Sequence, residues 1–301
     1  QAASYAKKFL RNKEVDRRVD TVDWDIRQAE KGEFEHFMLK EISEQVDTIQ
    51  RAAQQNKELI DHVVKEIRNA RGKFFVAAGS SHHDCLAASY IMSKVSKLHI
   101  NVVLASEFPH YEHYLTDKTL VIAVSQSGET ADVLEAVRTA KAKKSKIISL
   151  VNVIGSSLTR TSDIFLNINA GPEIGVLSTK TYTSQLALFT LLSYVLIDKY
   201  DEGKRKLTYL WNEIYHLTSA TTREKIKELA EKLQDKEHIF LIGRGLQYAT
   251  ALERLRGQNS PSRTSRGSVR PPFDRPFPTI SRLFSAIPSV ASYWYASCRI
   301  M

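Results

Sequence analysis

The chain has 301 residues, of which 43% are hydrophobic, and a net charge of +9 at pH 7; this length suits one large domain or two of ordinary size. The apolar run at residues 186–197 is too short to cross a bilayer and is typical of a core helix. No charged-then-apolar leader opens the chain, and Cys85 and Cys298 are too few for a disulfide framework. We therefore expect a cytoplasmic protein without a membrane segment.

The positive charge is concentrated near the C-terminal end. Residues 254–301 contain eight arginines, no lysine and one acid (Asp274), so this segment carries +7 of the total charge of +9. Arginine-rich tails can bind nucleic-acid phosphates with a steep salt dependence. The basic part of this one lacks interleaved aromatic residues. We therefore expect no nucleic-acid partner, which filter binding at two salt concentrations would check.

The first two-thirds of the chain predict an α/β fold. Residues 1–34 are polar and are interpreted as a linker or arm, and apolar residues then recur at helical spacing over 35–54 and 57–70. Strands are expected at 73–78, 100–105, 119–124, 146–151 and 164–168, with helices at 82–95 and from 131, and an apolar helix that follows a loop at 170–180 and extends to residue 200. Strands separated by helical crossovers predict a doubly wound, parallel five-stranded sheet flanked by helices, a flavodoxin-like three-layer sandwich.

The last third predicts an incomplete second domain. A charged helical connector over 201–236 precedes HIFLI and Gly243-Arg244-Gly245, which repeat the strand-then-glycine pattern of residues 73–81. We interpret 237–253 as the start of a second domain of the same kind, although such a domain needs about 120–150 residues and fewer than seventy follow His238. Beyond Glu253 the periodicity vanishes and prolines accumulate, so residues 254–301 are expected to form an unstructured or aberrant tail.

The most informative stretch is VIAVSQSGET at residues 121–130. Four apolar residues predict the end of a buried parallel strand, and the polar residues after them lead into a helix at Ala131. Hydroxyl groups at a helix N-terminus favour an anion such as a phosphate group. The loop has no lysine, which excludes the GxxxxGK[ST] nucleotide site. An ordinary strand-to-helix cap remains the alternative, because Ser and Thr are preferred caps.

Two further loops strengthen the phosphate interpretation. In a doubly wound sheet, ligands bind beyond the carboxyl ends of the strands. The loops at 79–81, 125–130 and 175–180 can all lie on that edge, and all three carry hydroxyl groups. The sequence therefore favours a sugar phosphate over a nucleoside triphosphate with magnesium.

Other reactive residues have simpler interpretations. The segments His82-His83-Asp84 and His110-Tyr111-Glu112-His113 lack the HExxH spacing of a metal site, so we expect no metal. Glu129 could act as a general base, but a first-turn acid that favours the helix dipole explains it equally well. Lys180 is not expected to form a Schiff base, and Cys85 is interpreted as a small buried residue rather than a reactive thiol.

At this point a family resemblance is apparent. The segments Trp24-Asp25, AEKG at 29–32 and HFMLKEISEQ at 36–45 resemble the beginning of the isomerase half of glutamine–fructose-6-phosphate aminotransferases. SQSGETAD at 125–132, Asn152 with GSSL at 155–158, and AGPEIGV–STK at 170–180 continue the resemblance in the same order. It covers about residues 15–253. The phosphate loop alone indicates the broader sugar isomerase (SIS) superfamily, whereas the other motifs are more specific.

The resemblance implies binding of fructose 6-phosphate and glucosamine 6-phosphate in amino sugar biosynthesis, without a cofactor. It implies also a homodimer and a glutaminase domain that supplies ammonia. Carried over by motif, the phosphate and sugar contacts are Gly79, Ser80, Ser81, Ser125, Gln126, Ser127, Thr130, Val176 and Ser178. Ser80 replaces the family's threonine and keeps the hydroxyl group, and Val46 stands where the family often has proline.

Departures from the family limit the expected chemistry. The chain opens on Gln1 rather than on the catalytic cysteine of a glutaminase domain, and no lysine follows Lys236. The family's Schiff-base lysine, proton-transferring glutamate and ring-opening histidine belong to motifs that would follow Glu253, so no catalytic residue is expected in this chain. We therefore expect a catalytically incomplete isomerase-half fragment.

The sudden loss of lysine after Glu253 leads to the hypothesis of a frameshift near codon 254. Coding DNA without an open frame for KEIS- and KHG-like motifs would contradict it. The alternative function is a non-enzymatic SIS module that senses a sugar phosphate. The HFMLKEISEQ segment argues against a stand-alone sensor, which has no need to join a glutaminase domain.

Overall fold

The computed structural model describes residues 29–175, 177–234 and 241–259, with side chains described up to Glu253 at the C-terminal end. Most of the predicted arm and most of the predicted tail lie outside these ranges. The helices are α2 (Phe37–Ala53), α3 (Lys57–Asn69), α4 (Ser80–Val95), α5 (Ala131–Ala142), α6 (Ser157–Thr161), α7 (Lys180–Val195), α8 (Tyr200–Leu217), α9 (Ala220–Leu233) and α10 (Leu246–Asn259), with a 3₁₀ segment η2 (Ala105–Tyr114).

The five predicted strands form one parallel sheet. They are β1 (Gly72–Ala77), β2 (Asn101–Leu104), β3 (Thr119–Ser125), β4 (Lys146–Val151) and β5 (Ile164–Asn167), in the order β2-β1-β3-β4-β5. All seven residues of β3, at the centre of the sheet, are buried. A continuous apolar run of this kind is what a strand covered on both faces requires. The predicted doubly wound fold is confirmed.

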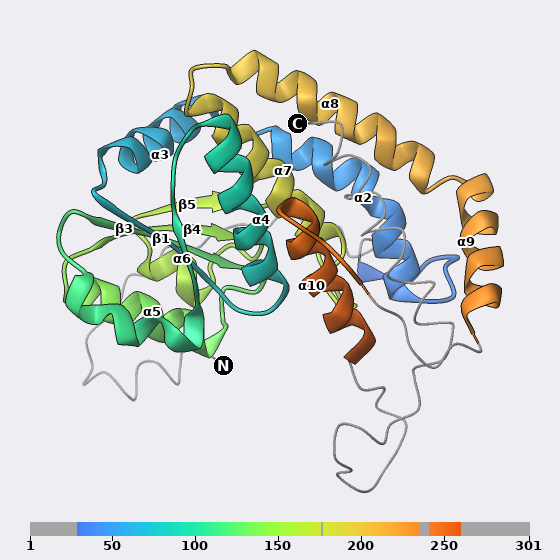
Figure 1. Cartoon of the computed structure of the whole chain (residues 1–301), viewed down its shortest axis with the longest axis horizontal. Helices are drawn as coiled ribbons and strands as arrows, with labels where there is room; N and C mark the ends of the chain where they lie inside the picture. The colour runs from blue at the N-terminus through green and yellow to red at the C-terminus, as the bar shows by residue number, and fades with distance from the viewer. Residues whose placement is uncertain (1–28, 176, 235–240, 260–301) are drawn as a thin grey trace, which may run out of the picture.

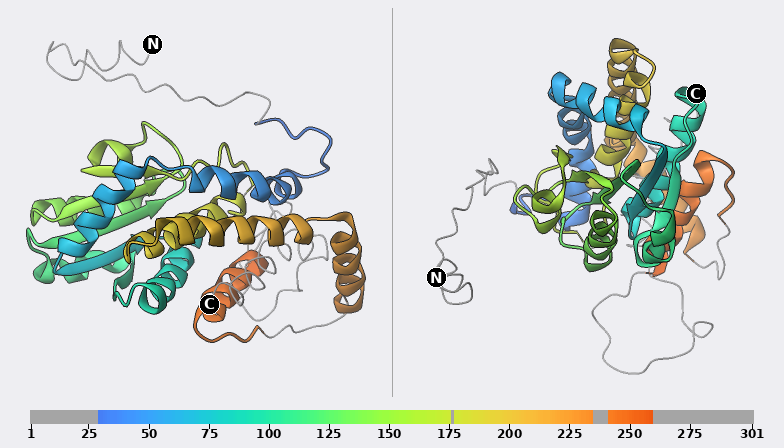
Figure 2. Two further views of the ribbon diagram at one scale, coloured as in Figure 1. Left: turned by 90° about the horizontal axis from the view of Figure 1, so that it is seen from above. Right: turned by 90° about the vertical axis from the view of Figure 1, so that its left-hand side faces the viewer.

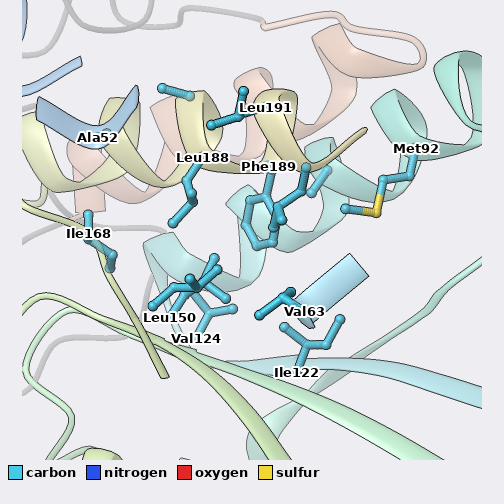
Figure 3. Packing of buried hydrophobic residues seen from close by; sticks show 14 of the residues in the cluster. Ala52, Val63, Met92, Ile122, Val124, Leu150, Ile168, Leu188, Phe189 and Leu191 are labelled. Carbon is cyan, nitrogen blue, oxygen red and sulfur yellow. The ribbon is translucent and has the colours of Figure 1, made fainter. Parts of the chain in front are cut away.

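Helices cover both faces of the sheet (Figure 1). On one face, α3, α4, α7 and α8 share a large core with alternate residues of the strands, in which the Phe75 and Phe189 rings meet edge to face with centroids 5.0 Å apart. Figure 3 shows Phe189 above Ile122 and Val124 in this core. On the other face, α5, α6 and η2 pack on the intervening strand residues. Successive side chains of β3 point to opposite faces of the sheet, so this strand contributes apolar residues to both cores.

The helix boundaries differ from the sequence-based expectations in two places. The predicted turn at residues 79–81 is wrong at Ser80 and Ser81, which form the first turn of α4, because Gly79 alone reverses the chain with a φ of +63°. The apolar helix ends at Val195 rather than at residue 200, since Asp198 adopts a φ of +60° before α8 begins. The expected connector consists of α8 and α9, and α9 lies beyond the end of α8, far from the sheet (Figures 1 and 2).

The C-terminal part differs as well. The predicted strand at 238–242 lies partly outside the described residues, and residues 241–244 do not form a strand. Helix α10 continues to Asn259, six residues into the segment expected to lack structure, and it packs on α4. Its end agrees with the Ser260-Pro261 pair, because the residue before a proline is disfavoured in a helix. Within the described ranges, no helix combines the length and the apolar character needed to span a bilayer.

Candidate functional site at the β1/β3 switch point

The carboxyl ends of β1 and β3 form the topological switch point of the sheet. Ala77 at the end of β1 lies beside Val124 of β3. The helix that follows β1, α4, packs on one face, and the helix that follows β3, α5, packs on the other. The loops at 78–79 and 126–130 therefore lead toward opposite faces of the sheet, at the position where doubly wound sheets bind ligands. This arrangement brings the predicted residues Gly79–Ser81 and Ser125–Thr130 to one place.

The loop from Ser125 to Thr130 is held by its own hydroxyl groups. The Ser125 Oγ accepts a hydrogen bond from Gly128 N at 3.0 Å and lies 3.1 Å from Thr130 Oγ1, while Ser127 Oγ accepts from Glu129 N at 3.2 Å. Gln126 and Ser127 are only partly buried. Thr130 is the N-cap of α5, but its side chain does not cap the helix. The positive end of α5 is thus left without a side-chain cap, next to partly exposed polar groups.

Gly128 sets the shape of this loop. It adopts a φ of +67°, and a Cβ atom at this position would lie 2.1 Å from Ser156 Oγ and 2.9 Å from Val151 Cγ1. The backbone is also fixed through Gly128 O, which accepts from Leu158 N, and through Gln126 O, which accepts from Asn152 N. Asn152 in turn bridges to the segment after β5, donating to Gly171 O and accepting from Ala170 N. A side chain at this position would therefore clash with its neighbours, and the loop conformation requires glycine.

Two predicted hydroxyl groups belong to the first turn of α4. Gly79 precedes the helix and offers no side-chain cap. Ser80 Oγ donates to Glu253 Oε1 at 2.7 Å, and the second oxygen of this carboxylate lies 2.7 Å from His83 Nδ1. Ser81 Oγ is buried and accepts from Gln185 Nε2 of α7 at 3.2 Å. Both serines are therefore held in place by other helices.

The loop before α7 has a different character. Glu173 caps the helix: its Oε1 accepts from Thr179 N at 2.8 Å and from Thr181 N at 3.2 Å, and its Oε2 accepts from Ser178 Oγ at 3.0 Å. The predicted sugar contact Ser178 is thus tied to a carboxylate, and its oxygen keeps acceptor capacity for a sugar hydroxyl group. The other predicted contact, Val176, lies outside the described residues.

Helix α4 contains a buried carboxyl group. Asp84 is fully buried in α4, and neither of its oxygens has a hydrogen-bond partner among the described residues. Burial, reinforced by the negative charges of Glu253 and Glu173, raises the pKa of Asp84 well above its ordinary value. The neutral form of this side chain is therefore favoured by its surroundings. Cys85 is buried as predicted, and burial raises the pKa of its thiol, which disfavours the reactive thiolate.

The remaining candidates have structural surroundings. Glu129 is exposed, and the hydrogen bond from Ser157 N to its Oε1, at 2.7 Å, lowers its pKa, which does not favour a general base. Lys180 is buried in an ion pair with Glu44, with Nζ 2.5 Å from Oε2. Burial lowers the pKa of His82, and among the described residues no group of three His, Cys, Asp or Glu side chains could hold a metal ion.

Sequence reasoning gave no role to several residues that shape the site. Glu173 could have been recognised, since an acid that precedes a predicted helix is a common N-terminal cap. Glu253 and Gln185 act on α4 across more than a hundred residues, and the local pattern contains no signal for such contacts. A surface hollow on α8, lined by Glu202, Arg205, Lys206 and Tyr209, shares no residue with the predicted set.

Comparison with known proteins supports the assignment of the fold. Residues 66–194 match the SIS domain family. The chain is 42% identical over 246 residues to the glutamine–fructose-6-phosphate aminotransferase of Thermococcus kodakarensis, and 36% identical over 249 residues to that of Thermotoga maritima. Each match covers 79% of this chain and 41% of the relative. The chain therefore spans about two-fifths of the length of these relatives.

Solved structures support the same assignment of the fold. The C-terminal domain of glucosamine-fructose-6-phosphate aminotransferase from Francisella tularensis superposes with a TM-score of 0.68 at 32% identity, over 76% of this chain and 68% of that domain. Glucosamine-6-phosphate deaminase from Thermotoga maritima shares the fold, with a TM-score of 0.57 at 21% identity, over 74% of this chain and 66% of that one. The chain thus belongs to the SIS-domain family, as a homologue of the isomerase half of glutamine–fructose-6-phosphate aminotransferases.

Proposed function

We propose that the crevice between β1 and β3 binds the phosphate group of a sugar phosphate of the fructose 6-phosphate class. The observation that carries this proposal is the start of α5, where a helix N-terminus without a side-chain cap follows the hydroxyl-bearing loop Ser125–Thr130. Helix N-termini bind phosphate through free amide groups and the helix dipole. Gln126 and Ser127 are partly exposed and can donate to the same anion.

Residues at the start of α4 are the second part of the proposed site. Ser80 and Ser81 lie at the neighbouring strand end, and their orientation is fixed by Glu253 and Gln185. Ser178 would accept a hydrogen bond from a sugar hydroxyl group while it donates to Glu173. The site would thus bind the phosphate at one end and orient the sugar at the other, which is a binding function rather than a covalent one.

Within the whole enzyme, we propose that this chain corresponds to an isomerase-half fragment of glutamine–fructose-6-phosphate transaminase, which serves amino sugar biosynthesis in the cytoplasm. No lysine follows Lys236 in the sequence, and Lys180 is engaged by Glu44. A Schiff base with the open-chain sugar therefore lacks a suitable amine, and the chain alone is expected to bind its ligand without converting it. A second copy and a glutaminase domain are the proposed partners, and sedimentation equilibrium would measure dimer formation.

A calorimetric titration tests the binding proposal. The chain is titrated with fructose 6-phosphate, glucosamine 6-phosphate and inorganic phosphate, and the series is repeated with Ser127→Ala. We expect saturable binding of both sugar phosphates and roughly tenfold weaker binding by the variant, in line with the loss of a hydrogen bond to a charged group. An intact, folded chain that binds none of the three would contradict the proposal.

A further inference from the structure

Glu41 in α2 is a buried acid whose partners lie 133 and 134 residues away in sequence. Its side chain is 2% exposed, and its carboxylate accepts from Ile174 N at 2.6 Å and from Gly175 N at 3.0 Å. These two amides belong to the segment that leads from β5 to Ser178. Burial raises the pKa of Glu41, while the two amide bonds and the positive charge of Lys180 oppose this effect. A buried carboxylate persists only where such bonds compensate for its desolvation.

The Glu41 carboxylate lies close to the backbone of Gly175. A Cβ atom on Gly175 would lie 2.4 Å from Glu41 Oε2, so a larger residue at this position would displace the carboxylate. One helical turn away, Glu44 of the same helix binds the buried Lys180 at the start of α7. Helix α2 thus holds the 173–180 loop at two points, one before and one after Ser178.

The rest of the loop is ordered by its own acid. Glu173 binds Ser178 Oγ and the first amides of α7, which attaches the loop to the helix that follows it but not to α2. A separate anchor comes from α2, which packs along α7. Without Glu41, the amides of Ile174 and Gly175 would lose their acceptor and the loop would lose one of its two attachments to α2.

We propose that Glu41 is a positioning residue that fixes the segment 173–175, which precedes the sugar contact Ser178, so that α2 controls the affinity of the site for the sugar part of its ligand. This inference rests on the proposed function, in which Ser178 contacts the sugar. Glu41 lies in the segment HFMLKEISEQ. A substitution in this segment would therefore change the affinity for the sugar part of the ligand without changing the affinity for the phosphate group.

The experiment compares three variants of the full chain. Glu41→Met removes the acceptor at similar volume, Glu41→Gln keeps an acceptor oxygen, and Thr48→Val is a control at a buried position of the same helix. Hydrogen–deuterium exchange of the Ile174 and Gly175 amides is measured without ligand. We expect at least tenfold faster exchange in Glu41→Met, with exchange in Glu41→Gln and Thr48→Val within about threefold of the wild type.

Binding provides the second measurement. Glu41→Met is expected to weaken the binding of fructose 6-phosphate about tenfold, while its affinity for inorganic phosphate stays within twofold of the wild type. Glu41→Gln is expected to retain most of the wild-type affinity for fructose 6-phosphate. Unchanged exchange at both amides in a folded Glu41→Met would overturn the inference, as would equal losses for both ligands. A wild type that binds no sugar phosphate would contradict the proposed function instead, while the exchange data would still decide whether Glu41 orders the loop.

Discussion

Two loops lie at the carboxyl edge of the sheet, and they differ in whether a side chain caps the N-terminus of the helix that follows. The loop after β3 is bonded through hydroxyl groups and leaves the start of α5 without a side-chain cap. The loop after β5 fills the start of α7 with the Glu173 carboxylate and is anchored by Glu41. A helix N-terminus already occupied by an anion has no need for a second one. The difference therefore favours the first loop over the second as the proposed phosphate-binding loop.

The largest expected effect comes from Gly128→Ala. The substitution combines a positive φ with a steric clash at Ser156, and we expect a loss of roughly 3 kcal/mol in the free energy of unfolding together with loss of phosphate binding. Urea denaturation and phosphate titration measure the two effects. Gly32→Ala is the control, because Gly32 has a similar φ and a Cβ atom there would meet nothing within 4 Å. Equal losses at both glycines would show that the clash is unimportant.

Glu173→Ala tests the other loop. Removing the cap of α7 is expected to lower the free energy of unfolding by about 1–2 kcal/mol, because Thr179 N and Thr181 N lose their acceptor. Chemical denaturation measures this loss, and Glu173→Gln should recover part of it through its remaining acceptor oxygen. An unchanged free energy of unfolding in Glu173→Ala would mean that α7, like α5, does not depend on a side-chain cap.

The buried acids near the second loop predict a distinct pH dependence. The folded-state pKa of Asp84 is raised, so the stability associated with this group is fully present below its unfolded pKa and is lost as pH rises toward the folded value. Asp84→Asn should therefore flatten the decline in stability as pH rises above the unfolded pKa of this group. Glu41→Gln should act in the same direction, because the Glu41 pKa is also raised. Parallel pH profiles for wild type and Asp84→Asn would contradict this expectation.

The smallest effect is expected at Glu129 in the first loop. Its pKa is lowered by the hydrogen bond from Ser157, so its contribution is present at neutral pH and is lost as pH falls through the folded pKa. Because the side chain is exposed, Glu129→Gln should leave the denaturation midpoint at pH 7 nearly unchanged. A large shift of that midpoint would show that the first loop also relies on a carboxylate.

The sequence was sufficient for the sheet because β3 is an uninterrupted apolar run and recognisable helices follow β1 and β3. It was sufficient for the position of the 125–130 loop, since a strand end and a helix start fix that loop locally. It could not identify Glu41, which lies beside the apolar stripe of α2 and is buried only because the distant 174–175 amides meet it. Nor could it show that Ser80 contacts Glu253, since that contact depends on how α10 packs on α4.

The most direct test is an amide-resolved NMR titration of the chain with inorganic phosphate and then with fructose 6-phosphate. The account predicts that inorganic phosphate shifts the amide resonances of residues 126–132 and leaves those of residues 179–183 unchanged, because Glu173 already occupies the start of α7. Shifts concentrated at residues 179–183, with residues 126–132 unaffected, would contradict it and place the anion at the other helix.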